Sequence, residues 1–312
     1  MGKILIVDST NNFLRCYSVI PTLTVNGECN GGVYGFLTSL YSFIKHTKPD
    51  KVILCWDGVG GSKKRRSIVK EYKDGRKPVR LNRNFDHEFE DVDKNKAWQR
   101  IRLNQFLEDL PVYQVTVDDI EADDVVAYLA KKYSEDKKII VSSDKDFYQL
   151  LDEKTVMYTP SKKSFVNNKD VLEKFKIHPI NFALARAIVG DKADNLIGVW
   201  GIGLVNVVKY FPFLGESKKI EVEELFSFCQ NGGDKYKKFL DDRQRIENNL
   251  QVMRLDTIMI GNSSIDKICT QLDRPLSLNA TSFRMKLVED GINSISENYL
   301  QGFKFLIAKG LE

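Results

Sequence analysis

The chain has 312 residues, 42% of them hydrophobic and 29% charged, with a formal net charge of +4. A chain of this length buries a full core in one large or two modest domains. No apolar stretch approaches the ~18 residues that cross a bilayer, and no signal-peptide core precedes the first predicted strand. Five cysteines without CxxC spacing and three dispersed histidines argue against a disulfide framework and a structural zinc site. We therefore expect a cytoplasmic protein without membrane contact.

The first half of the chain alternates predicted strands and helices. Strands are predicted at 3–7, 51–56, 111–117 and 137–143, and helices around Phe13 to Tyr17 and at 31–46, 95–109 and 121–133. This alternation predicts a parallel α/β sheet with helices on both faces. Helical patterns dominate from Ile180 onward, so we place a boundary there, with a first domain at 1–180 and a helical region at 181–312.

Three predicted strands end in a carboxylate. The runs KILIV, KVILCW and KKIIVSS lead to Asp8, Asp57 and Asp144. The carboxyl ends of parallel strands meet along one edge of a sheet, where ligands usually bind. Because many carboxylates at one edge repel one another unless hard cations lie between them, the pattern predicts a two-metal Mg²⁺ or Mn²⁺ site. Six further acids follow in tight groups: Glu121, Asp123, Asp124, Asp146, Asp191 and Asp194.

Each acid taken alone has a structural alternative. Asp8 has the pattern of a helix N-cap, and Asp57 that of a simple turn. Helical geometry separates Glu121 from Asp123, because helical residues two apart point ~200° away from each other. We therefore place Glu121 in the turn that enters the helix, and we expect Asp124 to cap or support that helix.

The small net charge hides a strongly basic segment from Ser62 to Arg83. It carries ten basic residues against two acids, so the segment is +8 and the rest of the chain is −4. Such a run is either a solvated, flexible loop or the electrostatic footprint of a polyanion. Its position directly after Asp57, beside the predicted metals, favours the polyanion. The expected contacts are Lys63, Lys64, Arg65 and Arg66.

Glycines mark a candidate anion site in the motif GVWGIG. Gly198, Gly201 and Gly203 make a tight hairpin, and a predicted helix starts immediately after it. Free backbone N–H groups at this point would form an anion site suited to a DNA phosphate, whereas a hairpin can also use glycine for packing alone. The position of the motif just after GDKADN favours the phosphate site.

Six motifs follow one another in a fixed order: IVDSTNNFLR, WDG, EYKDGR, IEADDVVAYLA, SSDKDFYQLL and VGDKADNLIGVWGIG. Together they resemble the 5′→3′ exonuclease and flap endonuclease family, most closely its bacteriophage and bacterial members, over residues 3–255. The resemblance implies a PIN-like α/β catalytic domain with a helical arch at about 62–105. It also implies a helix-hairpin-helix at about 185–211 that holds duplex DNA.

The resemblance further implies roles for single residues. Lys73 and Arg76 match arch-base cations that contact the scissile phosphate, and Arg15 matches a basic residue that contacts the substrate strand. Tyr72 either stacks on the terminal base or packs within the arch. Metal ligands carry over to Asp8, Asp57, Glu121, Asp123 and Asp144 in one region and to Asp146, Asp191 and Asp194 in another.

Two features depart from the family pattern. Val205 and Asn206 stand just after the hairpin, where family members commonly carry a basic residue, and the nearest cation is Lys209. The polar segment from Arg76 to Asp93 predicts an arch that is disordered without DNA.

The combined expectation is a Mg²⁺-dependent, structure-specific 5′-nuclease that cuts DNA and RNA–DNA hybrids during replication. The expected cofactors are two or more Mg²⁺ ions, which Mn²⁺ can replace, and K⁺ at the helix-hairpin-helix. The expected substrates are branched or nicked DNA with a 5′ end, and the expected protein partners of this monomer are a single-strand-binding protein or a sliding clamp. The alternatives are a PIN-type ribonuclease that cuts single-stranded RNA, which leaves the hairpin unused, and a catalytically inactive DNA-structure-binding protein, which leaves the acids unused.

Overall fold

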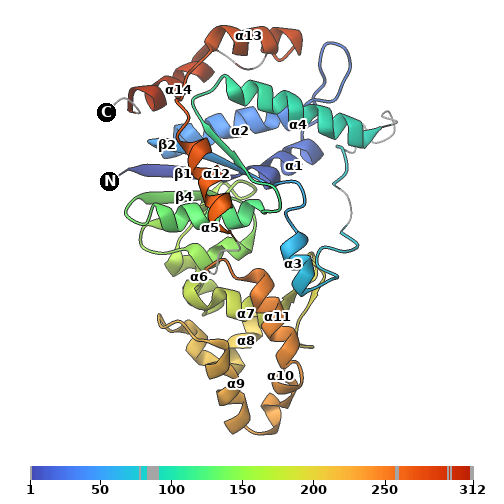
Figure 1. Ribbon diagram of the computed structural model, residues 1–312, viewed down its shortest axis with the longest axis vertical. Helices are drawn as coiled ribbons and strands as arrows, with labels where there is room; N and C mark the ends of the chain where they lie inside the picture. The colour runs from blue at the N-terminus through green and yellow to red at the C-terminus, as the bar shows by residue number, and fades with distance from the viewer. Residues whose placement is uncertain are drawn as a thin grey trace. The chain divides into compact units, whose positions relative to one another are not determined.

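The computed structural model describes residues 2–76, 79–82, 91–256, 260–293, 295 and 297–309 (Figure 1). The chain divides into two compact units, each assembled from separate segments. The first unit comprises residues 1–56, 78–116 and 262–312, and the second comprises residues 57–77 and 117–261. The boundary predicted at residue 180, where helical patterns take over from strands, stays a prediction.

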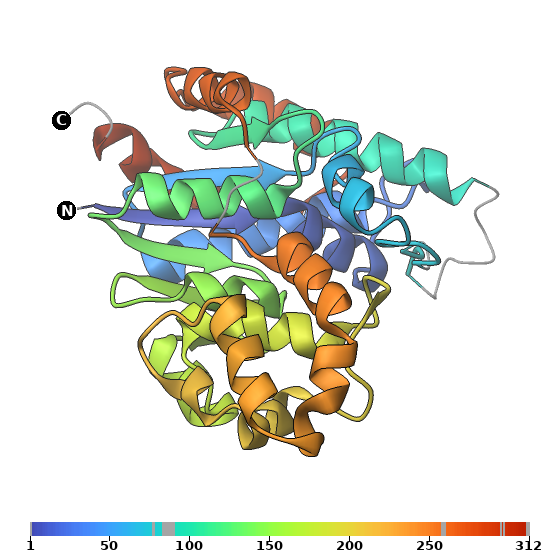
Figure 2. The same cartoon turned by 60° about the horizontal axis from the view of Figure 1, so that its bottom comes forward.

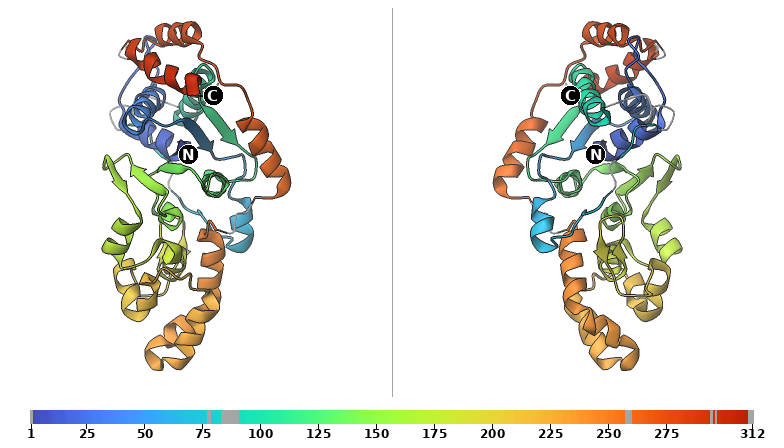
Figure 3. Two further views of the ribbon diagram at one scale, coloured as in Figure 1. Left: turned by 90° about the vertical axis from the view of Figure 1, so that its left-hand side faces the viewer. Right: turned by 90° about the vertical axis from the view of Figure 1, so that its right-hand side faces the viewer.

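Three parallel strands form the sheet of the first unit. Their order is β3 (Tyr113–Thr116), β2 (Lys51–Trp56) and β1 (Lys3–Asp8). β1 and β2 are buried over all but their first residue, as expected for parallel strands covered on both faces. Figure 3 shows α1 (Ser9–Val19) and α2 (Gly31–Thr47) on one side of this sheet and α12 (Asn262–Leu272) on the other.

Three more helices complete the first unit: α4 (Val92–Glu108), α13 (Ala280–Glu289) and α14 (Glu297–Lys309). The buried face of α4 is partly polar, because Gln99 accepts a hydrogen bond from the Gly32 amide at 2.7 Å and Asn95 donates one to the Cys29 carbonyl at 3.0 Å. Ile101, by contrast, is 60% exposed. The bounds of α4 confirm the helix predicted at 95–109. Its apolar residues do not all face the core, as the exposure of Ile101 shows.

The second unit contains a mixed sheet. β4 (Lys137–Val141) runs parallel to β5 (Thr155–Thr159), which pairs antiparallel with β6 (Ser164–Val166). α5 (Ala122–Lys132) begins directly after Glu121, and the 3₁₀ helix η1 (Lys145–Leu150) begins directly after Asp144. The predicted α/β class is confirmed, and β6 makes the sheet mixed rather than purely parallel.

The remaining elements of the second unit are mainly helical, as predicted. α7 (Phe182–Val189), α8 (Leu204–Tyr210) and the GVWGIG turn between them form the predicted helix-hairpin-helix, and the short strands β7 (Gly190–Asp191) and β8 (Leu196–Ile197) pair just before that turn. α11 (Arg243–Met253) packs along α7 (Figure 2). The others are α3 (Lys63–Ile68), α6 (Asn168–Phe175), η2 (Pro179–Asn181), η3 (Pro212–Gly215), α9 (Val222–Asn231), η4 (Asp234–Tyr236) and α10 (Lys237–Asp241).

Two expectations from the sequence bear on specific segments. In the described part of the chain, no helix combines the length and the apolar character that a bilayer span requires. The arch segment that we expect to be disordered without DNA includes residues 77, 78 and 83–90, which lie outside the described residues.

Candidate active site

Carboxylates gather around the start of α5 in the second unit. Glu121 is the N-cap residue, with an extended backbone (φ −80°, ψ 153°) and 4% exposure, so its predicted place in the entering turn is confirmed. Asp123 and Asp124 lie in the first helical turn, where the positive end of the helix dipole favours acids. The Asp57 carboxylate accepts a hydrogen bond from the Ala122 amide at 2.8 Å, which brings it to the same helix end.

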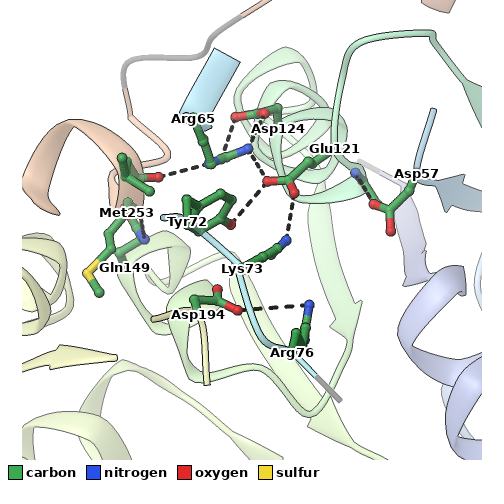
Figure 4. Close-up of polar contacts among 12 residues, drawn as sticks. Asp57, Arg65, Tyr72, Lys73, Arg76, Glu121, Asp124, Gln149, Asp194 and Met253 are labelled. Carbon is green, nitrogen blue, oxygen red and sulfur yellow. Dashed lines mark hydrogen bonds and ion pairs between the residues drawn. The ribbon is translucent and has the colours of Figure 1, made fainter. Parts of the chain in front are cut away.

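A buried arginine holds two of these acids (Figure 4). Arg65 Nη1 donates to Glu121 Oε2 at 2.5 Å and to Asp124 Oδ2 at 2.8 Å, and its Nη2 donates to Asp124 Oδ1 at 3.0 Å. Its Nε donates to the carbonyl of Val252 at 2.9 Å, and the side chain is only 3% exposed. The prediction that Arg65 contacts DNA is therefore wrong, because its donors are used inside the protein. The expected supporting role of Asp124 is confirmed.

Lys73 and Tyr72 complete the shell around Glu121. Lys73 Nζ donates to Glu121 Oε1 at 2.6 Å, and the Tyr72 hydroxyl donates to Oε2 at 3.3 Å. Burial by itself raises the pKa of Glu121, but the charges of Arg65 and Lys73 outweigh burial and lower it. Both carboxylate oxygens are thus engaged by the chain's own donors.

Tyr72 is a core residue rather than a surface ring. It is 3% exposed and packs in one cluster with Leu196, Val252 and Met253. The packing alternative is therefore confirmed, and the prediction that Tyr72 stacks on a terminal base is wrong, because its ring faces are covered.

The EYKDGR turn is tied to the loop that carries Asp191 and Asp194. Lys73 has a left-handed backbone (φ 58°), and its amide donates to the Asp194 carbonyl at 2.9 Å. The Asn195 side chain donates to the Glu71 carbonyl at 3.0 Å. Arg76 Nη1 lies 3.8 Å from Asp194 Oδ1 and remains 58% exposed. Burial raises the pKa of Asp194, although Lys73 and Arg76 oppose it. The two predicted catalytic cations are therefore brought beside predicted metal ligands.

A second arginine bridges the other acid group. Arg186, on α7, donates from Nε to Asp146 Oδ1 at 2.8 Å and from Nη2 to Asp191 Oδ2. Burial and repulsion from Asp144 raise the pKa of Asp146 to about 6, against the opposing charge of Arg186. The sequence reasoning missed Arg186. Its signal is a single cation in the otherwise apolar helix FALARAIV.

The donor set is compatible with divalent metal ions. Asp144 and Asp191 both raise the pKa of Asp146, and both raise that of Asp194, so like charges gather here. Carboxylate oxygens are the ligands that Mg²⁺ and Mn²⁺ prefer. Within the described ranges, no three potential ligands approach one another closely enough to hold a metal as the side chains stand. Cations of the chain instead pair with three of these acids: Lys73 with Glu121, and Arg186 with Asp146 and Asp191.

Two predicted site residues belong to the first unit. Asp8 caps α1, with its carboxylate accepting from the Asn11 amide at 3.2 Å, so its N-cap alternative is confirmed. Arg15 donates to the Asn12 side chain at 2.8 Å. The metal role of Asp8 and the DNA role of Arg15 stay predictions.

The other predicted cations and glycines lie in the second unit. Lys63, Lys64 and Arg66 are exposed on α3, and Lys63 Nζ pairs with Asp119 Oδ1 at 2.7 Å. A Cβ added at Gly198 would lie 2.0 Å from the Val189 carbonyl oxygen, so the packing alternative holds for this glycine. At Gly201 and Gly203 an added Cβ would meet open space. The DNA contacts of Lys63, Lys64, Arg66, Gly201 and Gly203 stay predictions.

Comparison with known proteins identifies relatives over most of the chain. Residues 3–176 match the family model described as the 5′-3′ exonuclease, N-terminal resolvase-like domain. A 5′-3′ exonuclease of Aquifex aeolicus is 30% identical over 217 residues, covering 68% of this chain and 70% of that protein. A 5′-3′ exonuclease of Buchnera aphidicola is 31% identical over 208 residues, covering 64% and 67%. A flap endonuclease of bacteriophage T5, solved with DNA and metal ions, has the same fold, with a TM-score of 0.64, 20% identity and coverage of 93% and 99%.

Proposed function

Because the chain belongs to the 5′-3′ exonuclease family, we propose that it is a Mg²⁺-dependent, structure-specific 5′-nuclease that removes primers or flaps in replication. It hydrolyses phosphodiesters in DNA and in RNA–DNA hybrids. The observation that carries the proposal is the gathering of carboxylates in the second unit, each group balanced by a cation of the same unit. The pairs are Glu121 with Arg65 and Lys73, Asp146 and Asp191 with Arg186, and Asp194 with Arg76.

The acids divide between two metal positions. Asp57, Glu121 and Asp123 at the start of α5 would hold one ion, together with Asp8 and Asp144 in the family pattern. Asp146, Asp191 and Asp194 would hold the other. When bound, two divalent ions supply an activated water and stabilise the leaving 3′ oxygen.

Lys73 and Arg76 act on the substrate phosphate. Lys73 donates to Glu121 in the substrate-free protein, and its side chain keeps 20% exposure. In the complex, Lys73 exchanges this carboxylate for a phosphate oxygen, and the exposed Arg76 reaches a second one. The positive charges of Lys73 and Arg76 then offset the negative charge that develops on the phosphate in the transition state.

The binding surface and partners extend the proposal. Lys63, Lys64 and Arg66 on α3, together with Arg15, contact the 5′ strand of nicked or branched DNA. The hairpin after α7 holds duplex and takes K⁺. A single-strand-binding protein or a sliding clamp recruits the enzyme, which acts as a monomer.

End-labelled flap, nicked and hybrid substrates test this function. The protein is incubated with each substrate in Mg²⁺ and in EDTA, with the Asp144→Asn variant as the matched control. We expect short 5′ products only for the wild type in Mg²⁺. Cleavage of single-stranded RNA alone would identify a ribonuclease instead. Tight binding of flap substrates without cleavage would identify an inactive DNA-structure-binding protein.

A further inference from the structure

The GVWGIG hairpin, which leads into α8, presents an exposed indole. Trp200 is 92% exposed, while its neighbours Val199 and Ile202 are 3% and 7% exposed. The Ile202 amide donates to the Val199 carbonyl at 3.2 Å, and Gly201 has φ +74°. These features define a type II turn with Trp200 at its second position and glycine at its third. The two buried neighbours anchor the turn, so the exposed position of Trp200 is built into the fold.

Several contacts fix the hairpin to its own unit. The Asn249 side chain donates to the carbonyls of Ala187 and Ile197 at 3.0 and 2.9 Å. The Val199 amide donates to the Ile188 carbonyl at 2.8 Å, and Gly198 packs directly against Val189. The backbone that carries Trp200 is therefore held in place before any ligand arrives. Because the backbone is already fixed, covering Trp200 orders only its two side-chain torsions, which favours binding at this position.

The chain segment that carries Trp200 is apolar and uncharged. Ile197 and Val205 are 68% and 69% exposed, and no charged residue occurs in the sequence from Asn195 to Val208. Gly201 and Gly203 leave open space where side chains would otherwise stand. At the turn itself a ligand thus meets an indole next to accessible backbone, whereas charged residues, Arg245 among them, line the pocket beside Ile197.

We propose that Trp200 packs against a deoxyribose of the duplex DNA that the hairpin binds. The proposal rests on the nuclease function proposed above and names one contact within it. A DNA strand alternates an apolar sugar with an anionic phosphate, and backbone N–H groups commonly contact the phosphate. Base faces are stacked inside a duplex, so the sugar is the apolar surface that an indole at this hairpin can cover. This contact takes the place of the basic side chain that family members commonly carry just after the hairpin, where this chain has Val205 and Asn206.

Intrinsic fluorescence tests the contact directly. The chain has three tryptophans, of which Trp56 is 2% exposed and Trp98 is half-buried, so Trp200 supplies the solvent-exposed emission. The difference between wild type and Trp200→Phe isolates this signal. When a flap with a downstream duplex is added in EDTA, we expect the emission of Trp200 to shift to shorter wavelength and to be protected from acrylamide quenching.

Affinity gives the second readout. Trp200→Ala should raise Kd for the same substrate by about tenfold, because tryptophan is a frequent hot-spot residue. The salt dependence of Kd should not change, because no charge is removed. Phe165→Ala is the matched control: Phe165 is an aromatic residue, 49% exposed, on β6, and its removal should leave Kd unchanged.

The possible failures are distinguishable. If Trp200→Ala binds the duplex as tightly as wild type while Mg²⁺-dependent cleavage persists, the Trp200 contact is wrong and the nuclease function stands. If the Trp200 signal responds to duplex but no substrate is cleaved, the nuclease function fails and the DNA contact stands. A response to single strands alone would overturn the duplex assignment. Sedimentation in which Trp200→Ala turns a dimer into a monomer would show self-association instead of DNA contact.

Discussion

Replacing Arg65 with methionine should destabilise the second unit by about 3 kcal/mol or more. The substitution removes four hydrogen bonds from a side chain that is 3% exposed and leaves Glu121 and Asp124 buried without this partner. Breaking a buried ion pair by removing one partner costs roughly 3–5 kcal/mol. Because Lys73 still balances Glu121, we place the expected loss at the lower end of that range.

Urea unfolding at pH 7 without divalent ions measures this loss. The matched control is Lys63→Met, the same kind of change on the same helix, α3. Lys63 pairs with Asp119 while the two side chains remain 71% and 49% exposed, and exposed ion pairs contribute about 1 kcal/mol or less. If Arg65→Met and Lys63→Met lower the free energy of unfolding by similar amounts, the buried network does not carry the stability assigned to it.

The stability difference should also depend on pH. The folded protein lowers the pKa of Glu121, so its contribution is present above the ordinary carboxyl pKa of about 4.3 and is lost as the pH falls through the lowered value. Without Arg65 the pKa of Glu121 rises. The gap between wild type and Arg65→Met should therefore be largest near neutral pH and should shrink below about pH 4. A gap that stays constant across this range would mean that lost packing, and not charge, explains the effect.

Three further predictions concern the cleavage rate and the affinity for DNA. Asp144→Asn should reduce cleavage by roughly 10³-fold while leaving DNA binding nearly intact, and near-wild-type turnover would defeat the site assignment. Lys73→Ala should mainly lower the single-turnover rate, whereas Lys64→Ala should mainly raise Kd; if both changed affinity alone, Lys73 would be an ordinary phosphate contact. Gly203→Val should weaken duplex binding and change its salt slope by about one unit or less, since no charge is lost. Gly203 is a cleaner test site than Gly201, whose φ of +74° strains any other residue.

The parts of the fold that could be read from the sequence are those set by local pattern. Continuous apolar runs predicted β1, β2 and β4, and their ends placed Asp8, Asp57 and Asp144 correctly. The placement of Glu121 before α5 followed from helical geometry together with the hypothesis that Glu121 and Asp123 face one metal pair, because helical residues two apart cannot share a face. These features depend on spacings of a few residues, so they can be predicted from the sequence.

The features that the sequence hid depend on partners distant in the chain. Within the basic segment, nothing distinguished Arg65 from Lys64 or Arg66, and its burial results from Glu121 and Asp124, which lie 56 and 59 residues away. The burial of Gln99 on α4 has the same origin, because its side-chain oxygen accepts a hydrogen bond from the Gly32 amide, 67 residues away. Charge and hydropathy can be read from neighbouring residues, whereas the hydrogen-bond partner that allows a polar group to be buried can lie far away in the sequence.

Exposure separates the cations of this site into two kinds. Arg65 is 3% exposed and is held by two acids and a carbonyl, so it cannot leave Glu121 without opening the unit. Lys73 touches the same carboxylate but keeps 20% exposure, and Arg76 keeps 58%. If Glu121 is a metal ligand as proposed, a metal ion would compete with Lys73 for its carboxylate, while Arg65 would continue to hold that carboxylate in place. In the proposed metal site, Arg65 would therefore hold the acids together before a metal ion binds, and Lys73 would be the cation that a metal ion displaces.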